Sequence, residues 1–224
     1  MCYNIYQLCY TKLYNLVKTC AQETNNYASE RTRGEVLIRA NIKGIDLELE
    51  TSQNCFSPSK IDAGTLAMLS CVEFEPGQKI LDLGCGYGVV GITAARLIGA
   101  SGVYMVDIDP EAVLYSKKNA ERNGVGDVHI MQSDGFEALQ ESGFDIILSN
   151  PPYHTDFAVA KKFIEKGFNR LKIGGRMLMV TKRKEWYKNK FISIFGGVRV
   201  HEIDGYFVFE AERRNLSYAK KSKS

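Results

Sequence analysis

The sequence lacks the features that mark several large classes of protein. Nowhere do 18 apolar residues follow one another, which argues against a membrane-spanning helix. The first 14 residues contain neither a basic stretch nor the continuous apolar core of a secretory signal. The six cysteines form no C-x-x-C pair, and none of the three histidines is spaced beside them as a zinc ligand. We therefore expect a cytoplasmic protein with reduced cysteines, no membrane contact and no bound metal.

A strong excess of charge is missing as well. Lys and Arg number 29 against 26 Asp and Glu, and the net charge of +3 permits a polyanionic partner without requiring one. Among the 224 residues 45% are apolar. This is enough to bury the core of one compact α/β domain with a small appendage.

The two ends of the chain differ in pattern from its middle. Apolar residues recur at helical spacing in residues 1–22, which predicts an amphipathic helix packed on the main domain or on a second subunit. Residues 23–34 form a polar linker by composition. The protein is accordingly expected to be a monomer or a homodimer. We divide the chain into a helical extension and linker (1–34), a main domain (35–215) and a basic tail (216–224).

From Lys79 onward, short apolar strands alternate with amphipathic helices, a pattern that predicts a parallel sheet covered on both faces. Before it, apolar and polar residues alternate around Lys43–Gly44 and predict a hairpin or two short strands. A short helix is expected around Phe136–Gln140. The last two strands should form an antiparallel hairpin across Asp204–Gly205. The predicted fold is α/β, with a doubly wound, mostly parallel seven-stranded sheet.

A glycine-rich stretch, LDLGCGYGVVG at residues 81–91, lies where a strand turns into a helix. Open α/β sheets bind their ligands at such a place. Gly84, Gly86 and Gly88 allow the backbone to turn sharply and to approach a ligand closely. The following helix offers free N–H groups to an anion, so we expect the cofactor site here.

The glycine pattern alone leaves two cofactors open. Gly86–Gly91 satisfies G-x-G-x-x-G, and Asp107 lies downstream near the distance expected for a dinucleotide site. Asp82, however, precedes the first glycine, and a carboxylate there repels a pyrophosphate but attracts a cation. S-Adenosylmethionine carries an ammonium and a sulfonium group beside its carboxylate, so it suits an Asp next to a helix N-terminus better.

Acidic residues end two further predicted strands. Asp107 could accept hydrogen bonds from both ribose hydroxyls, whereas Asp109 is the better N-cap for the next helix. Asp134 could accept from an adenine amino group, or it could simply cap the short helix. Ile108 should flank the adenine ring. The predicted cofactor-binding residues are Asp82, Gly84, Cys85, Gly86, Gly88, Asp107, Ile108, Asp134, Gly135 and Asn150.

Four stretches together resemble one family. LDLGCGYGVVG, VDIDP, QSDGF and SNPPYH occur in the order found in class I S-adenosylmethionine-dependent methyltransferases that modify exocyclic amines or amides. Upstream, CFSPSKIDAGTLAML resembles the stretch before the glycine loop in the small-domain ribosomal RNA guanine-N2 methyltransferases. The similarity covers roughly Val36–Glu212. It implies a Rossmann-like fold, S-adenosylmethionine as the cofactor and RNA, most simply ribosomal RNA, as the partner.

Two departures from that family concern the substrate. Bacterial members often carry a duplicated, inactive N-terminal half, whereas about 34 residues precede the main domain here. Many have Phe where this chain has Tyr153, which keeps the aromatic ring. By resemblance, Phe56, Ser57, Asp62 and Thr65 fold over the cofactor and the target base. Taken alone, the same residues would only begin a helix.

Asn150, Pro151, Pro152 and Tyr153 are the predicted catalytic residues. An exocyclic amine is a weak nucleophile because its lone pair is delocalised, so two acceptors must orient its N–H groups. The Asn150 side-chain oxygen and the Pro151 carbonyl can accept them, since the two prolines keep this corner stiff. Alignment would then carry most of the catalysis. Tyr153 would stack on a base turned out of its helix. The alternative is that Asn-Pro-Pro only terminates a strand.

Substrate contacts are predicted at Phe56, Tyr153, His154, Lys182 and Arg183. His154 could be a base, but the reaction requires none and a structural role is the simpler interpretation. The stretch TKRKEWYKNK after the fifth strand contains five cations, one Trp and one Tyr. It suits a phosphate-binding rim, and a solvated helix explains it equally well.

The sequence leaves the substrate open. Methyl transfer to guanine N2 of RNA is the leading interpretation. A protein glutamine amide, as in release-factor methyltransferases, and adenine N6 of RNA or DNA are alternatives. A catalytically inactive RNA-binding module is the alternative outside enzymes, and the intact Asp82, Gly84, Gly86, Asp107 and Asn150 argue against it.

Overall fold

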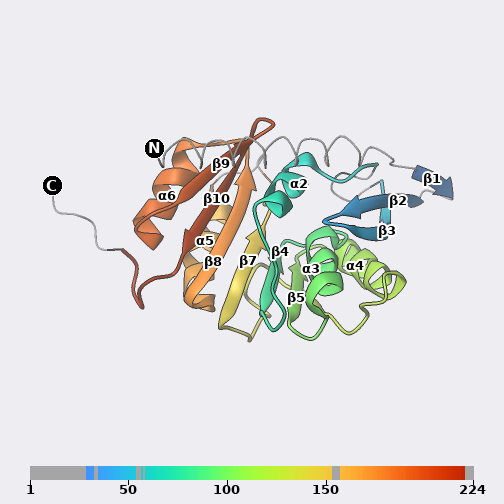
Figure 1. The fold of residues 1–224 in the computed structure, drawn as a ribbon, viewed down its shortest axis with the longest axis horizontal. Helices are drawn as coiled ribbons and strands as arrows, with labels where there is room; N and C mark the ends of the chain where they lie inside the picture. The colour runs from blue at the N-terminus through green and yellow to red at the C-terminus, as the bar shows by residue number, and fades with distance from the viewer. Residues whose placement is uncertain (1–28, 33–34, 54–56, 58, 153–156, 220–224) are drawn as a thin grey trace, which may run out of the picture.

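The computed structural model describes residues 29–32, 35–53, 57, 59–152 and 157–219. In these residues the chain forms a seven-stranded sheet flanked by helices and a separate three-stranded sheet (Figure 1). The predicted N-terminal helix lies outside the described residues. In the part of the chain that is described, no helix is long and apolar enough to cross a membrane.

The large sheet has the strand order β6-β5-β4-β7-β8-β10-β9. The pairs along β6, β5, β4, β7 and β8 are parallel, while β10 is antiparallel to both β8 and β9. The chain therefore winds outward from β4 to β6 and then returns to build the other half from β7. The prediction of a doubly wound sheet with a C-terminal antiparallel hairpin is confirmed. The strands are β4 Ile80–Leu83, β5 Val103–Asp107, β6 His129–Gln132, β7 Phe144–Ser149, β8 Leu171–Thr181, β9 Arg199–Ile203 and β10 Tyr206–Glu212.

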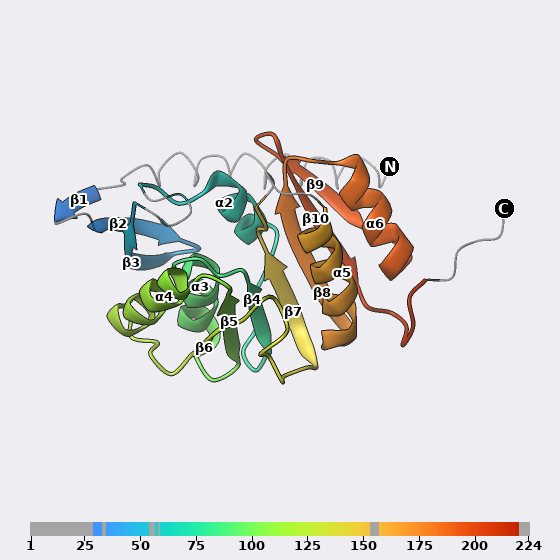
Figure 2. The same cartoon turned by 180° about the vertical axis from the view of Figure 1, so that it is seen from behind.

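Helices cover both faces of this sheet because neighbouring strand residues point to opposite sides. Ile80 and Ile146 belong to the apolar cluster formed with α2, α3 and α4. Leu81 and Ile147, one residue further along, belong to the cluster formed with α5 and α6. Figure 2 shows α5 beside β8 on the second face. The helices are α2 Ala63–Ser70, α3 Val89–Ile98, α4 Pro110–Arg122, α5 Ala158–Arg170 and α6 Glu185–Phe195.

The small sheet lies beside α3 and α4 (Figures 1 and 2). Lys43 and Gly44 form the turn between β2 and β3 with φ of 53° and 79°, as a two-residue hairpin turn requires, so the predicted hairpin is confirmed. The assignment of 29–32 to a polar linker is wrong, because these residues pair with β2 along its free edge. The antiparallel strands are β1 Ser29–Thr32, β2 Glu35–Ile42 and β3 Ile45–Ser52.

Two asparagines one turn apart, one in the last turn of α4 and one at its C-cap, attach the small sheet to the rest of the domain. Asn119 Oδ1 accepts from the Glu50 N–H at 2.7 Å, and its Nδ2 donates to the Glu50 carbonyl at 2.8 Å. Asn123 makes the same pair of bonds with Glu48, at 3.1 and 2.7 Å. These side chains occupy the place of a fourth strand at the edge of β3. Asn119 Nδ2 also donates to the carbonyl of Tyr87 at 2.8 Å, which links the sheet to the glycine-rich loop.

The short helix predicted around Phe136–Gln140 is not formed, and that prediction is wrong. Phe136 and Leu139 are both buried in the apolar cluster under α5. The Ala138 N–H donates to Ser133 Oγ at 3.0 Å instead of to a backbone carbonyl one helical turn earlier. Core contacts at both ends of so short a segment therefore decide its conformation.

Candidate active site

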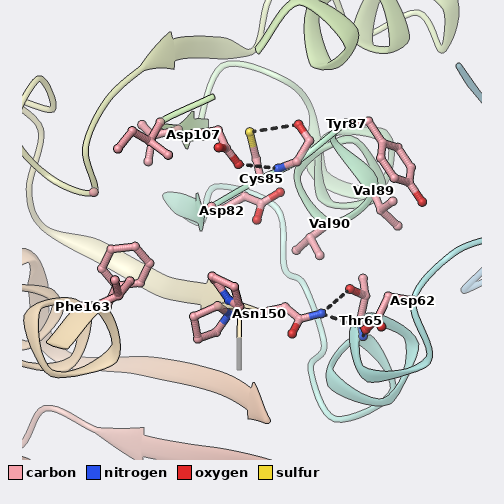
Figure 3. A pocket seen from close by; sticks show the side chains of 18 of the residues that line it. Asp62, Thr65, Asp82, Cys85, Tyr87, Val89, Val90, Asp107, Asn150 and Phe163 are labelled. Atoms are coloured by element: carbon pink, nitrogen blue, oxygen red, sulfur yellow. Dashed lines mark hydrogen bonds between the residues drawn. The ribbon is translucent and has the colours of Figure 1, made fainter. Parts of the chain in front are cut away.

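A cavity of about 320 Å³ lies at the carboxyl ends of β4, β5 and β7, where the winding of the sheet reverses. This volume falls in the range of small-molecule sites. Figure 3 shows the side chains that line it, from the glycine-rich loop, from α2 and α5, and from the strand ends. The cavity is lined by the predicted residues Asp82, Gly84, Cys85, Gly86, Asp107, Ile108, Asp134, Gly135, Asn150, Pro151 and Pro152.

The glycine-rich loop begins with a sharp turn. Gly84 and Gly86 have φ of 78° and 56°, a region that favours glycine. The N–H groups of Gly84 and Cys85 both donate to the Val106 carbonyl, at 2.9 and 3.0 Å, so the loop is tied to β5. Burial raises the pKa of the Cys85 thiol well above its ordinary value, so Cys85 is a neutral packing group. Gly88 begins α3 and does not line the cavity, unlike the other predicted loop residues.

Asp82 is a buried carboxylic acid in the wall of the cavity, with 3% of its surface exposed. Its Oδ2 accepts a hydrogen bond of 2.8 Å from the Gly91 N–H in the first turn of α3. Burial raises the pKa of Asp82 to about 7, the Gly91 bond opposes the shift, and the charge of Asp107 adds to it. The side chain therefore stands near its midpoint at neutral pH, and a cation beside it would draw it into the ionised form.

Asp107 is held by backbone N–H groups on both carboxylate oxygens. Oδ2 accepts from Gly86 at 2.8 Å, and Oδ1 accepts from Asp109 at 3.0 Å. Asp109 in turn caps α4 by accepting from the Glu111 N–H at 2.9 Å, as the sequence predicts. Asp107 therefore does not cap the helix. It lines the cavity beside Ile108, a residue that is 63% exposed.

The third acidic residue predicted near a strand end is Asp134, which follows β6. Asp134 lines the cavity and accepts from Lys162 Nζ at 3.0 Å. Its side chain caps no helix, because none forms there. Gly135 has φ of 59° and lies against the Phe163 ring, which a Cβ at this position would approach to 2.9 Å. The glycine lets the α5 ring close one side of the cavity.

Asn150 lies in the cavity wall just after β7, and its carboxamide has a defined orientation (Figure 3). Nδ2 donates to Asp62 Oδ2 at 2.8 Å and to Thr65 Oγ1 at 3.0 Å. A carboxylate can only accept, so the nitrogen must be the atom that faces Asp62. Oδ1 is then directed elsewhere. Over the described part of the chain, it is the only buried side-chain N or O atom without a hydrogen-bond partner.

Of the predicted substrate contacts, the structure describes Lys182 and Arg183. Phe56, Tyr153 and His154 lie outside the described residues. Lys182 and Arg183 follow the carboxyl end of β8 at the same edge of the sheet, but they do not line the cavity. Lys182 Nζ lies 4.9 Å from the centre of the Tyr206 ring, and Arg183 stacks on Phe157 at 5.0 Å.

Several cavity residues are missing from the predicted site. Phe163 and Val159 lie on α5, where their spacing is that of an ordinary core face. Ser133 precedes Asp134, and no motif in the sequence marks it as a site residue. Among the residues weighed only by resemblance, the structure brings three to the cavity wall: Ser57, Asp62 and Thr65. Within the described residues, no group of three or more His, Cys, Asp or Glu side chains is placed to hold a metal ion.

The doubly wound sheet, the glycine turn and the acidic strand ends define a nucleotide-cofactor site of the kind that transferases use. Residues 46–210 match the family model described as the methyltransferase small domain. The chain belongs to this family of methyltransferases.

Particular members of the family are similar over most of this chain. Ribosomal RNA small subunit methyltransferase C of Hahella chejuensis is 33% identical over 172 residues, 75% of this chain and 50% of that protein. YbxB of Bacillus subtilis is 31% identical over 179 residues, 77% of this chain and 89% of that protein. The chain spans about half the length of the ribosomal RNA methyltransferases that it matches.

The fold comparison gives the same family. The 16S rRNA N2 G1207 methyltransferase of T. thermophilus, solved in complex with AdoMet and guanosine, has a TM-score of 0.75 and 26% sequence identity. The match covers 90% of this chain and 62% of that one.

Proposed function

We propose that this protein transfers a methyl group from S-adenosylmethionine to an exocyclic amine of a base in RNA, with guanine N2 of ribosomal RNA as the target, in the cytoplasm. One observation carries the proposal. The buried Oδ1 of Asn150 is an acceptor without a donor in the wall of a cofactor-sized cavity. A buried polar atom left without a partner costs free energy, so a persistent one points to a ligand that supplies the donor.

The donor set of the cavity fits S-adenosylmethionine. Asp82 would face the cationic amino-acid part, where its ionised form gains a partner. Asp107 would accept from the ribose hydroxyls, and Ile108 and Phe163 would bracket the adenine ring, beside Asp134. A resident pyrophosphate would instead place two charges near two carboxylates. When bound, the cofactor supplies a methyl group already attached to a good leaving group.

The chain's own task is then to orient the nucleophile. Asn150 Oδ1 and the Pro151 carbonyl accept the two N–H groups of the target amine and so direct its lone pair toward the methyl carbon. Pro151 and Pro152 provide no N–H that would compete for these acceptors. The positive charge that develops on the nitrogen is stabilised by the same two oxygens, and its proton leaves after transfer.

Three lines of support favour RNA over the other substrates. The ribosomal RNA methyltransferases named above are relatives with a described activity, and the T. thermophilus enzyme is solved in complex with guanosine. The stretch before α2 brings Ser57 and Asp62 to the cavity, as the guanine-N2 group would require. Tyr153 and Phe56 would stack on the base, and Lys182 and Arg183 would contact phosphates at the same sheet edge.

The test is a labelling experiment with tritiated S-adenosylmethionine. Purified protein is incubated separately with small ribosomal subunits, deproteinised ribosomal RNA, DNA and a protein fraction that contains release factors. The expected result is label in ribosomal RNA that digests to N2-methylguanosine, and none with Asn150→Ala. Label in protein would assign the glutamine amide instead, and label in N6-methyladenosine would assign adenine. Cofactor binding without transfer to any fraction would support the inactive RNA-binding module.

A further inference from the structure

Both hydrogen atoms of the Asn150 amide are used by acceptors from one helix start. Asp62 is the N-cap of α2, and Thr65 lies in its first turn. Their oxygens lie 2.8 and 3.0 Å from Asn150 Nδ2, although 88 and 85 residues separate them from Asn150 in the sequence. Nothing in the described residues donates to the other end of the amide, Oδ1. The carboxamide is thus anchored on its donor side only.

This asymmetry sets which end of the amide meets the substrate. If the amide were turned over, Oδ1 would face the Asp62 carboxylate, and two acceptors would repel each other. The turned amide would also present N–H groups to the N–H groups of the target amine. Thr65 alone does not decide the orientation, because a hydroxyl can donate or accept. Asp62 is therefore the residue that fixes the polarity of Asn150.

The charge of Asp62 acts on the acceptor strength of Asn150 as well. Hydrogen bonds in series polarise one another, so an anion that accepts from Nδ2 increases the electron density on Oδ1. An electron-rich Oδ1 stabilises the positive charge that forms on the attacking nitrogen. The effect is local because both side chains lie in the wall of the same cavity.

The packing of α2 and the N-cap bond of Asp62 together hold Asp62 in position. Met68 and Leu69 are buried beneath the helix, with 0% and 1% of their surfaces exposed. Gly64 lies against Tyr206 of β10, whose ring a Cβ would approach to 2.8 Å. Asp62 Oδ2 also accepts from the Thr65 N–H at 2.9 Å, as an N-cap does. Any test must therefore separate the cap from the contact with Asn150.

We propose that Asp62, assisted by Thr65, is a positioning residue that orients and polarises the Asn150 carboxamide so that its oxygen receives the target amine. The inference rests on the proposed function, since it assigns to Asn150 the role of amine acceptor. It adds that methyl transfer depends on a contact between α2 and the corner after β7.

Two variants of Asp62 separate its roles. Asp62→Ser keeps an N-cap oxygen, because Ser caps helices as well as Asp does, but its shorter side chain does not reach Asn150. We expect kcat to fall about 100-fold, while the Kd for the cofactor stays within about threefold. Asp62→Asn keeps an oxygen that reaches Asn150 and still caps α2, so kcat should fall by about tenfold or less. Equal kcat values for Asp62→Ser and the wild type would overturn the inference.

Thr65 supplies a test that does not depend on the cap. Thr65→Val removes one acceptor of the Asn150 amide and keeps the shape of the side chain, so kcat should fall about tenfold. Thr65→Ser keeps the hydroxyl and should stay within about threefold of the wild type. If Asp62→Ser does not fold, the two Thr65 variants test the inference in its place. Equal kcat values for Thr65→Val and Thr65→Ser would then overturn it.

A double-mutant cycle shows whether Asp62 acts through Asn150. Because a positioning residue has nothing left to position in an Asn150→Ala background, adding Asp62→Ser to that variant should lower the residual turnover less than twofold. A further drop of about 100-fold would mean that Asp62 acts independently of Asn150.

A measurement without turnover keeps this inference separate from the proposed function. In the full chain labelled with ¹⁵N, the side-chain amide protons of Asn150 should exchange slowly in the wild type and at least tenfold faster in Asp62→Ser and Thr65→Val. Unchanged exchange would overturn the contact whatever the substrate. Faster exchange in a protein that labels no RNA would uphold the contact and reject the proposed function alone.

Discussion

The backbone N–H of Gly91 donates a hydrogen bond of 2.8 Å to Oδ2 of Asp82, nine residues earlier in the chain. This bond joins the end of β4 to the first turn of α3 and satisfies one of the free N–H groups at the helix start. The helix begins at Gly88, which has no side chain to act as a cap. Asp82 therefore serves the fold and the cavity at once, and only its role in the cavity requires the ionised form.

Cofactor affinity should depend on the ionisation of Asp82. Because burial raises the pKa of Asp82 to about 7, the fraction of ionised side chain falls as the pH drops below 7. A ligand whose cationic group prefers the carboxylate should bind about tenfold more weakly at pH 6 than at pH 8. Isothermal titration calorimetry with S-adenosylmethionine measures this slope. The same titration with Asp82→Asn shows how much of the pH dependence of the Kd comes from ionisation of the ligand itself. The same pH dependence of the Kd in both proteins would contradict the role given to Asp82.

Asp82→Asn should weaken cofactor binding and stabilise the protein without ligand. The amide oxygen can still accept from the Gly91 N–H, but the cation loses its counter-charge, so the Kd should rise about 100-fold. The folded-state pKa of Asp82, about 7, lies above its unfolded value, so the unfolded chain ionises first and the free protein loses stability between about pH 4 and pH 7 and regains none above pH 7. The free energy of unfolding of the variant at pH 8 should be higher by about 4 kcal/mol, since a pKa difference of about 3 units is worth about 1.4 kcal/mol per unit. Urea denaturation without ligand measures it, and the gain should vanish near pH 4.

Asn150→Ala should abolish transfer and spare cofactor binding. The substitution removes the acceptor for the target amine, which should lower kcat about 1000-fold or more. The folded protein loses two hydrogen bonds but also an unpartnered buried oxygen, so its Tm should change little. Single-turnover assays and calorimetry measure the two effects. Wild-type turnover by this variant would remove the role given to Asn150.

Gly91→Ala should destabilise the fold through a steric conflict. A Cβ at Gly91 would lie 2.5 Å from Cγ of Met105 on β5, so α3 or the strand must move. We expect a loss of about 2 kcal/mol in the free energy of unfolding, measured in urea. Gly126→Ala is the matched control, because its Cβ would meet nothing closer than 3.5 Å. A loss of the same size in both variants would contradict the steric explanation, because the lower backbone entropy of an unfolded chain with Ala in place of Gly favours folding.

The pattern of strands and helices, and many of the residues that line the cavity, could be predicted from the sequence itself. Strand ends, glycine turns and the cap at Asp109 depend on residues that are neighbours in sequence, and they appear where the pattern placed them. Since parallel strands end at one edge of the sheet, Asp82, Asp107 and Asn150 had to meet there. The winding of the sheet then fixed the cavity between them.

Tertiary packing alone decided the rest. The orientation of Asn150 comes from Asp62 and Thr65, more than 80 residues away, and no local pattern encodes a contact between helix and corner. In the sequence, Phe163 has the spacing of an ordinary core residue of α5. In the structure its ring lies against Gly135 and lines the cavity. The predictions for residues 29–32 and 136–140 were wrong because strand pairing and burial against distant segments outweigh the weak conformational preferences of short stretches.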